Sequence, residues 1–203
     1  MPGPPRMQIA WATPSGQFSA IEPSLPDVAA HAAALARAYS DPQNAALLGH
    51  VDSFEDEEVV EHYEDMREDG AHAFLFFADG ELAGDGDLRG LRAGNAEFAF
   101  LVAARSSQGK GLGTRFALML HAFAFRHLGL HSVYASIVPN NVASRRVFDK
   151  LGYTLDDGPV ARGYADDVGD LTLRLDRERF EHLHGEATAA IHIGPIGEPT
   201  RTP

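Results

Sequence analysis

Residues 108–114, which read Gln-Gly-Lys-Gly-Leu-Gly-Thr, are the stretch of this chain best suited to bind a ligand. They follow an apolar run, residues 98–103, and precede a helix-like run, residues 115–126. Glycines let the backbone approach a ligand closely, and the free N–H groups in the first turn of a helix attract anions. The segment therefore predicts an anion-binding loop between a strand and a helix, with a tight turn that binds nothing as the alternative.

The glycine spacing argues against two common phosphate loops. The GxxxxGK[ST] spacing of a Walker loop is missing. A dinucleotide fingerprint fits poorly, because the glycines fall as GxGxG and the segment lies in the middle of the chain. A second informative segment, residues 138–153, reads Val-Pro-Asn-Asn-Val-Ala-Ser-Arg-Arg-Val-Phe-Asp-Lys-Leu-Gly-Tyr.

Together the two segments resemble the signatures of the GNAT acetyltransferase superfamily. Residues 108–113 fit its Q/R-x-x-G-x-G/A pattern, and residues 138–153 resemble its second signature, a strand end followed by N-x-x-S/A, a short helix and L-G-F/Y. The resemblance covers roughly residues 18–176. It implies an N-acetyltransferase that uses acetyl-CoA as co-substrate, with direct attack by a neutral amine and no acyl-enzyme.

The resemblance also implies which residues bind acetyl-CoA. The loop backbone would hold the pyrophosphate, and a strand edge would pair with the pantetheine arm and supply an N–H group as oxyanion donor. Asn141 matches a position that contacts the pantetheine region, although a helix N-cap is the plain alternative. The residues expected to bind the cofactor are Leu101, Val102, Ala103, Gln108, Gly109, Lys110, Gly111, Leu112, Gly113, Thr114, Asn141, Ser144 and Phe148.

Two departures from the family pattern concern proton transfer. Phe148 stands where many N-terminal acetyltransferases of the superfamily have a tyrosine acid, and Ser136 stands where one branch has a glutamate base. The remaining pattern resembles the RimJ/RimL branch, whose matching serine is Ser144. A serine hydroxyl is a weak acid, so the expected catalytic role of Ser144 is to hydrogen-bond the thiolate, and a local helix-start role is the alternative.

Glu97 is the base that the sequence predicts. Alternation along its strand puts Glu97, Ala99 and Leu101 on one face. A carboxylate within an apolar strand is costly to bury unless it is paired, and burial raises its pKa toward the range useful for a base. An exposed or salt-bridged glutamate is the alternative interpretation.

Composition limits the possible partners. The formal net charge of −12 disfavours nucleic acid and suits a cationic acceptor such as an amine or a peptide N-terminus, although acidic proteins are also common simply for solubility. No apolar run approaches the ~20 residues of a membrane span and the start lacks a signal-peptide core, so a cytoplasmic protein is expected. The absence of cysteine excludes disulfides and thiolate ligands, and the histidine spacing predicts no metal site.

The acidic stretch of residues 52–69 allows two interpretations. It has a helical pattern in which Val59, Tyr63 and Met66 share a face, with Ser53 and Asp56 as its capping box. Its acids are expected to form a solvated helix face, or else an anionic wall that steers a polyamine, a basic peptide end or an aminoglycoside.

The expected fold is α/β, with a mixed, mostly antiparallel sheet, a central βαβ acetyl-CoA-binding unit and flanking helices. Residues 1–16 and 186–203 are expected to be flexible around one acetyltransferase domain, residues 17–185, which could form a homodimer. Helices are expected at 28–39, 53–69, 115–126 and 142–150, and strands at 18–21, 73–78, 81–88, 96–103, 132–138, 152–155 and 170–175.

The sequence leaves the acceptor open. The main prediction is acetyl transfer to a primary amine on a protein N-terminus, a polyamine or another small molecule. Transfer of a different acyl group is one alternative, and a non-catalytic acyl-CoA-binding sensor or scaffold is another, because the usual tyrosine acid is missing.

Overall fold

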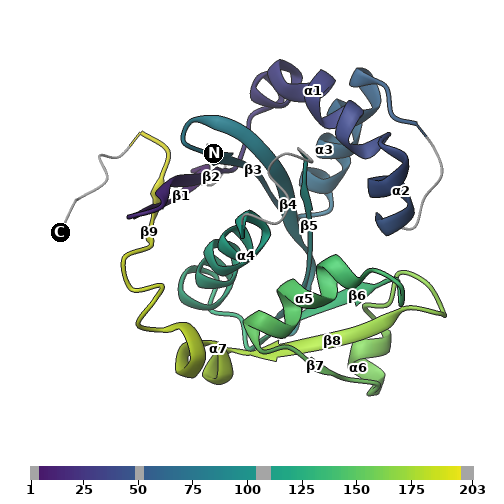
Figure 1. Cartoon of the computed structure of the whole chain (residues 1–203), viewed down its shortest axis with the longest axis vertical. Coiled ribbons are helices and arrows are strands. Elements are labelled where there is room, and N and C mark those ends of the chain that lie inside the picture. Colours follow the sequence, from purple (N-terminus) through teal and green to yellow (C-terminus); the bar gives the residue numbers. More distant parts are fainter. Residues whose placement is uncertain (1–4, 49–52, 104–110, 198–203) are drawn as a thin grey trace.

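The structure of the protein, a computed structural model, describes residues 5–48, 53–103 and 111–197 (Figure 1). In these residues nine strands form one sheet in the order β7-β8-β6-β5-β4-β3-β2-β1-β9. The strands are β1 (Met7–Thr13), β2 (Gly16–Ile21), β3 (His72–Ala78), β4 (Glu81–Arg92), β5 (Asn95–Val102), β6 (Ser132–Ile137), β7 (Thr154–Leu155), β8 (Leu171–Asp176) and β9 (His192–Pro195). The helices are α1 (Leu25–Tyr39), α2 (Pro42–Leu48), α3 (Asp56–Glu68), α4 (Leu112–Ala122), which continues into a π-helical turn (Phe123–His127), α5 (Val142–Leu151), α6 (Pro159–Arg162) and α7 (Arg177–His184).

Neighbouring strands in the described sheet are antiparallel, except for β5 and β6, which are parallel and joined through α4. A parallel pair needs a crossover connection, which a helix usually supplies. This is the central βαβ unit expected from the sequence. The predicted fold class, a mixed and mostly antiparallel sheet with flanking helices, is confirmed.

Two hairpin turns set the register of β3, β4 and β5. Asp79 and Gly80 both have positive φ angles, 50° and 85°, as the favoured two-residue hairpin turn between β3 and β4 requires. Ala93 and Gly94 have φ angles of 49° and 76° in the turn between β4 and β5. These turns fix which side chains of β4 lie beside those of β5.

A hydrophobic core lies on each face of the sheet. Phe74 and Phe76 of β3 belong to the cluster that also contains buried residues of α4, α5 and α7, whereas Leu75 belongs to the cluster beneath α1 and α3. Figure 1 shows α1, α2 and α3 together on one side of β4 and β5, with α4 on the other. The cavity described below takes lining residues from both clusters, such as Val59 from the α1 and α3 cluster and Phe148 from the other.

The chain ends are more ordered than the sequence suggests. Residues 1–16 and 186–203 were expected to be flexible, and this is wrong for Met7–Thr13 and His192–Pro195, which form β1 and β9 and pair with each other. The pairing joins segments at opposite ends of the chain, so no local sequence pattern predicts it. The single-domain boundary drawn at 17–185 stays a prediction.

Two helix starts also differ from expectation. Helix α1 begins at Leu25, where Ser24 and Asp27 form a capping box, and Glu55 with Glu58 caps α3 in place of the predicted Ser53 and Asp56. Strand β8 lies between β6 and β7. In the described residues, no helix is long and apolar enough to cross a membrane.

Candidate functional site

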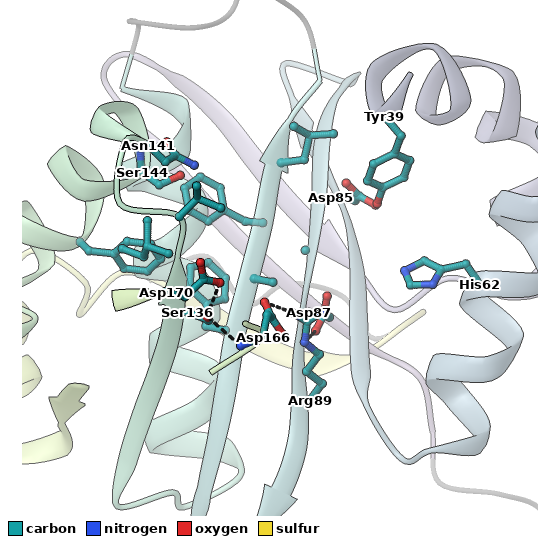
Figure 2. A pocket seen from close by; sticks show the side chains of 18 of the residues that line it. Tyr39, His62, Asp85, Asp87, Arg89, Ser136, Asn141, Ser144, Asp166 and Asp170 are labelled. Atoms are coloured by element: carbon teal, nitrogen blue, oxygen red, sulfur yellow. Dashed lines mark hydrogen bonds and ion pairs between the residues drawn. The ribbon is translucent and has the colours of Figure 1, made fainter. Parts of the chain in front are cut away.

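The parallel strands β5 and β6 pair over only part of their length. Their register runs from Asn95 beside Ser132 to Glu97 beside Tyr134. Beyond this point β5 continues to pair with β4 as far as Val102, while β6 pairs with β8 as far as Ile137. The two strands therefore diverge, and a cavity of about 510 Å³ opens at the divergence (Figure 2).

The cavity wall combines residues from both halves of the chain. One side comes from α1, the segment before α3, and α3; the floor comes from β4 and β5; the other side comes from β6, α5 and the segment before β8. The described lining residues are Tyr39, Phe54, Val59, His62, Asp85, Gly86, Asp87, Arg89, Phe98, Ala99, Phe100, Leu101, Ser136, Ile137, Val138, Asn141, Ser144, Phe148, Asp166, Asp167 and Asp170.

The floor contains two buried carboxylates that the sequence reasoning missed. Asp85 and Asp87 lie two residues apart on β4 and share a face, and only 3% and 7% of their surfaces are exposed. Gly84 and Gly86 alternate with them, and a Cβ atom at either position would overlap a carbonyl oxygen of β5. The signal that could have found the pair is two acids in one strand, the same argument that identified Glu97.

Asp85 is held by two tyrosines from the covering helices. Its Oδ2 atom accepts hydrogen bonds from the hydroxyls of Tyr39 on α1 and, at 2.8 Å, Tyr63 on α3. Its Oδ1 atom is buried and has no hydrogen-bond partner among the described residues. Burial raises the pKa of Asp85 to about 6, against the opposing effect of the two tyrosine hydrogen bonds.

Asp87 is also poorly compensated. Its Oδ1 atom has no hydrogen bond within the described part of the chain, and the Nε atom of Arg89 lies 3.9 Å away. Burial raises the pKa of Asp87 to about 7; the charge of Arg89 opposes this, while the charges of Asp85 and Glu97 add to it. A carboxylate with such a pKa exchanges a proton readily near neutral pH.

Arg89 is committed mainly to Glu97, the predicted base. Its Nε and NH2 atoms each lie 3.2 Å from a carboxylate oxygen of Glu97, and NH2 also lies 3.5 Å from Oδ2 of Asp166. Burial raises the pKa of Glu97 despite the opposing hydrogen bonds and charge of Arg89. Glu97 is not among the described residues that line the cavity, whereas Asp87 is, so the base role of Glu97 stays a prediction.

The start of α5 contributes the predicted residues of the second signature. Asn141 caps the helix by accepting a hydrogen bond of 2.9 Å from the backbone N–H of Ser144, and both residues line the cavity. The capping and binding interpretations of Asn141 are therefore compatible. Phe148 also lines the cavity, is 3% exposed and meets the rings of Phe98 and Phe100 edge-on.

The start of α4 contains two glycines and lacks a side-chain cap within the described residues. Gly111, in the left-handed conformation at φ 78°, occupies the N-cap position, and no side chain caps the helix. A Cβ atom at Gly113 would lie 3.1 Å from the ring of Phe100, so a glycine keeps the helix start close to β5. Leu112 and Thr114 flank Gly113 in the first turn. The predicted loop residues Gln108, Gly109 and Lys110 lie outside the described residues.

The backbone of β5 divides its predicted cofactor residues into two groups. The N–H of Ala103 donates to the carbonyl of Ala83 on β4 at 2.9 Å. Because backbone groups alternate along an antiparallel strand, those of Leu101 also point toward β4, while those of Phe100 and Val102 point toward the divergence. Leu101 is one of the residues that line the cavity. Ala103 is not among the described lining residues.

Negative charge dominates the cavity. Asp166, Asp167 and Asp170 add to the two floor carboxylates, while Arg89, already bound to Glu97, is the one lysine or arginine among the described lining residues. Ser136 links its hydroxyl to this acidic segment, donating to Oδ2 of Asp170 at 3.1 Å and accepting from the N–H of Asp166 at 3.0 Å.

Helix α3 contributes little to this charge. It lines the cavity with Val59 and with His62, whose pKa is lowered by desolvation and then by the charge of Arg89. None of the α3 acids is among the described lining residues, so the anionic wall comes from β4 and the segment before β8. Within the described residues, no group of three or more histidines and carboxylates is placed to hold a metal ion.

Known proteins resemble the chain in sequence. The sequence profile described as acetyltransferase (GNAT) domain matches residues 25–154. The probable N-acetyltransferase YjcK of Bacillus subtilis (strain 168) is 29% identical over 99 residues, which are 47% of this chain and 55% of that protein. The N-acetyltransferase 9-like protein of Nematostella vectensis is 29% identical over 94 residues, 46% of this chain and 44% of that protein. The chain thus spans about half the length of these curated relatives.

Solved structures resemble the fold. RimJ of Mycobacterium smegmatis, in complex with CoA-disulfide, superposes with a TM-score of 0.69 at 19% identity, covering 93% of this chain and 97% of that chain. Spermidine N-acetyltransferase of Vibrio cholerae, in complex with CoA and spermine, has a TM-score of 0.65 at 14% identity, covering 80% and 97%. At these identities the likeness shows a shared fold.

Proposed function

The chain belongs to the GNAT acetyltransferase family, and from this premise we propose that it transfers the acetyl group of acetyl-CoA to a primary amine by direct attack. The supporting observation is the cavity at the divergence of β5 and β6, which has an uncapped helix start near one end and a buried, uncompensated carboxylate in its floor. The RimJ/RimL branch stays a resemblance that the sequence suggests.

The described residues fit acetyl-CoA. Phe100 turns its backbone groups toward the divergence, where the pantetheine arm would pair as an added strand. The first turn of α4 presents N–H groups without a side-chain cap, which suits a pyrophosphate. Asn141 and Ser144 face this path from the start of α5. When bound, acetyl-CoA supplies a thioester whose acetyl group a neutral amine can take as the CoA thiol leaves.

Asp87 is our candidate for the group that prepares the amine. An alkyl ammonium ion cannot attack until it loses a proton, and Asp87 lies in the cavity floor with its pKa raised to about 7. Glu97 stays the base that the sequence predicts, but its side chain is bound to Arg89. We infer that Glu97 acts through Arg89, by keeping that cation away from Asp87.

Ser144 is our candidate partner for the departing thiolate. It lines the cavity opposite β4, and its backbone N–H is already bound to Asn141. A hydroxyl there can donate a hydrogen bond to sulfur without giving up its proton. Phe148, which has no acidic proton, can only pack in this region.

The geometry favours acetyl over an acidic acyl group such as succinyl. An acyl chain with a terminal carboxylate would need a cation in the cavity, and Arg89, the single arginine or lysine among the described lining residues, is paired with Glu97. The surrounding aspartates would also repel it.

The test is a thiol-release assay on a panel of primary amines, run beside a calorimetric titration of acetyl-CoA. Asp87→Asn should lower kcat/KM for the amine by about 100- to 10,000-fold, because general base catalysis contributes that much, and should leave cofactor affinity unchanged. Glu61→Gln, which removes a charge from the exposed face of α3, is the control.

Three outcomes separate the alternatives. Full activity of Asp87→Asn would reject it as the base and return the role to Glu97. Cofactor binding without thiol release on any amine would favour a non-catalytic sensor. No cofactor binding would contradict the proposed function as a whole.

A further inference from the structure

The floor of the cavity contains two buried carboxylates, whereas a single reacting amine needs only one. Asp85 and Asp87 are each less than a tenth exposed and line the same floor. Each has an Oδ1 atom that lacks a hydrogen bond within the described residues. An uncompensated buried carboxylate is costly, so a cation is the partner that Asp85 lacks, whereas Asp87 has Arg89 at a distance of 3.9 Å.

Neighbouring groups supply little positive charge to these two carboxylates. Arg89 is bound to Glu97 at 3.2 Å and lies 3.9 Å from Asp87. The groups facing Asp85 are the hydroxyls of Tyr39 and Tyr63, which are neutral donors and both bind its Oδ2 atom. These hydroxyls orient Asp85 and leave Oδ1 for another partner.

We propose that the cavity takes an acceptor with two amino groups: one reacts beside Asp87, and the second, still protonated, binds Asp85. This deepens the proposed function and rests on it. The structure assigns the acceptor class as a small flexible diamine or polyamine, and Asp85 as the residue that selects it.

The positions of the two carboxylates set their roles. Asp87 is paired in register with Ala99, next to the point where β5 and β6 diverge, and Asp85 is paired with Leu101, two residues nearer the start of the loop. The acyl end of the cofactor would lie at the closed end of the divergence and its pyrophosphate near the loop, so Asp87 lies closer to the reacting group. Asp85 accepts hydrogen bonds from two tyrosine hydroxyls, which fix its orientation. It is therefore better suited to bind an ammonium group than to exchange a proton.

The spacing between the carboxylates limits the acceptor. Residues two apart on a strand are separated by about 7 Å, twice the rise of about 3.3 Å per residue. An extended alkyl chain advances roughly 1.25 Å per bond, so nitrogens separated by about four or five carbons span this distance. Asp166, Asp167 and Asp170 at the edge of the cavity could hold further amines of a longer polyamine.

The experiment compares three ligands that differ in charge and length. Calorimetry on the full chain saturated with CoA, which permits no turnover, measures the affinities of 1,5-diaminopentane, 5-amino-1-pentanol and 1,2-diaminoethane. The amino alcohol matches the long diamine in size but has one charge, and the short diamine has two charges that cannot reach both aspartates. We expect the long diamine to bind at least tenfold more tightly than either.

Variants then locate the second charge. Asp85→Asn should reduce the preference for the long diamine over the amino alcohol to less than about threefold, since truncating one partner of a buried charge pair costs at least tenfold in affinity. Glu61→Gln, which removes the same charge from an exposed position on α3, should keep the preference. Melting temperatures of both variants check that they are folded.

Each outcome decides the inference separately from the proposed function. Equal binding of diamine and amino alcohol by the unmodified protein would overturn the two-amine site, even if the enzyme acetylates monoamines. A preference that survives Asp85→Asn would reject Asp85 as its origin. Diamine preference in binding, with no acetylation of any amine, would uphold the site and refute the proposed reaction. Selective binding of peptides with a basic second residue over every diamine would overturn the small-molecule class.

Discussion

Replacing Asp87 by asparagine should stabilise the protein at pH 8 while removing its activity. A carboxyl whose pKa is higher in the folded chain than in the unfolded chain binds its proton more tightly when folded. Its contribution to stability is therefore present at low pH and is lost as pH rises from about 4 to about 7, the range between the ordinary pKa of 3.8 and the raised pKa of Asp87. The neutral amide does not undergo this loss.

The size of the effect follows from the same two values. Raising a carboxyl pKa from 3.8 to about 7 corresponds to about 4 kcal/mol, which is the upper limit of the gain at pH 8. About 2 to 3 kcal/mol of this should develop between pH 5 and pH 8. The gain measured at pH 8 should be smaller than the limit, because an amide without hydrogen bonds also costs free energy to bury.

The assay is urea unfolding of the ligand-free protein at pH 5 and pH 8. The quantity compared is the change in unfolding free energy between the two pH values, for the unmodified protein and for Asp87→Asn. Glu61→Gln serves as the control because it removes one charge from an exposed site. If Asp87→Asn loses as much stability as the unmodified protein between pH 5 and pH 8, Asp87 is not a buried, poorly compensated carboxylate and the reasoning is refuted.

Two further predictions follow from the packing of β4 against β5. Glu97→Gln should shift the acidic limb of the pH profile of kcat/KM to lower pH by about one unit. The reason is that Asp87 loses a negatively charged neighbour and Arg89 becomes available to pair with it. An unchanged profile would contradict the inferred role of Glu97. Gly84→Ala should lower the unfolding free energy by about 3 kcal/mol or more in urea titrations, because its Cβ would overlap the Leu101 carbonyl, whereas a tolerated substitution would show that β4 can shift away from β5.

Much of the architecture around the site could be read from local sequence. The Asp79-Gly80 turn, the strand-glycine-helix order around residues 98–126 and the start of α5 are short-range patterns, and their elements appear where they were expected. Asn141 was interpreted both as a cap and as a binding residue, and it caps α5 while lining the cavity. Such features depend on residues within a few positions of each other, so the sequence expresses them directly.

The acidic floor could not be read in the same way. Glu97 and Asp87 are both acids within strands. The alternation of side chains along a strand does not show which of the two carboxylates binds the guanidinium group of Arg89. The register that places Arg89 beside Glu97, and the segment that brings in Asp166, decide this in the folded chain. The sequence reasoning proposed Glu97, which lies on the strand next to the one that carries Asp87.

The sequence by itself determined the family, the βαβ unit and the start of α5, because glycine conformation, capping and strand alternation are local properties. Only the tertiary structure decided that β1 pairs with β9, that two tyrosines from α1 and α3 grip Asp85, and that the cavity gathers more carboxylates than cations. These depend on the order and register of strands far apart in the chain. The pairing of distant strands depends on the free energy of the whole sheet and of the two hydrophobic cores that cover it. The sequence of one segment does not contain this information.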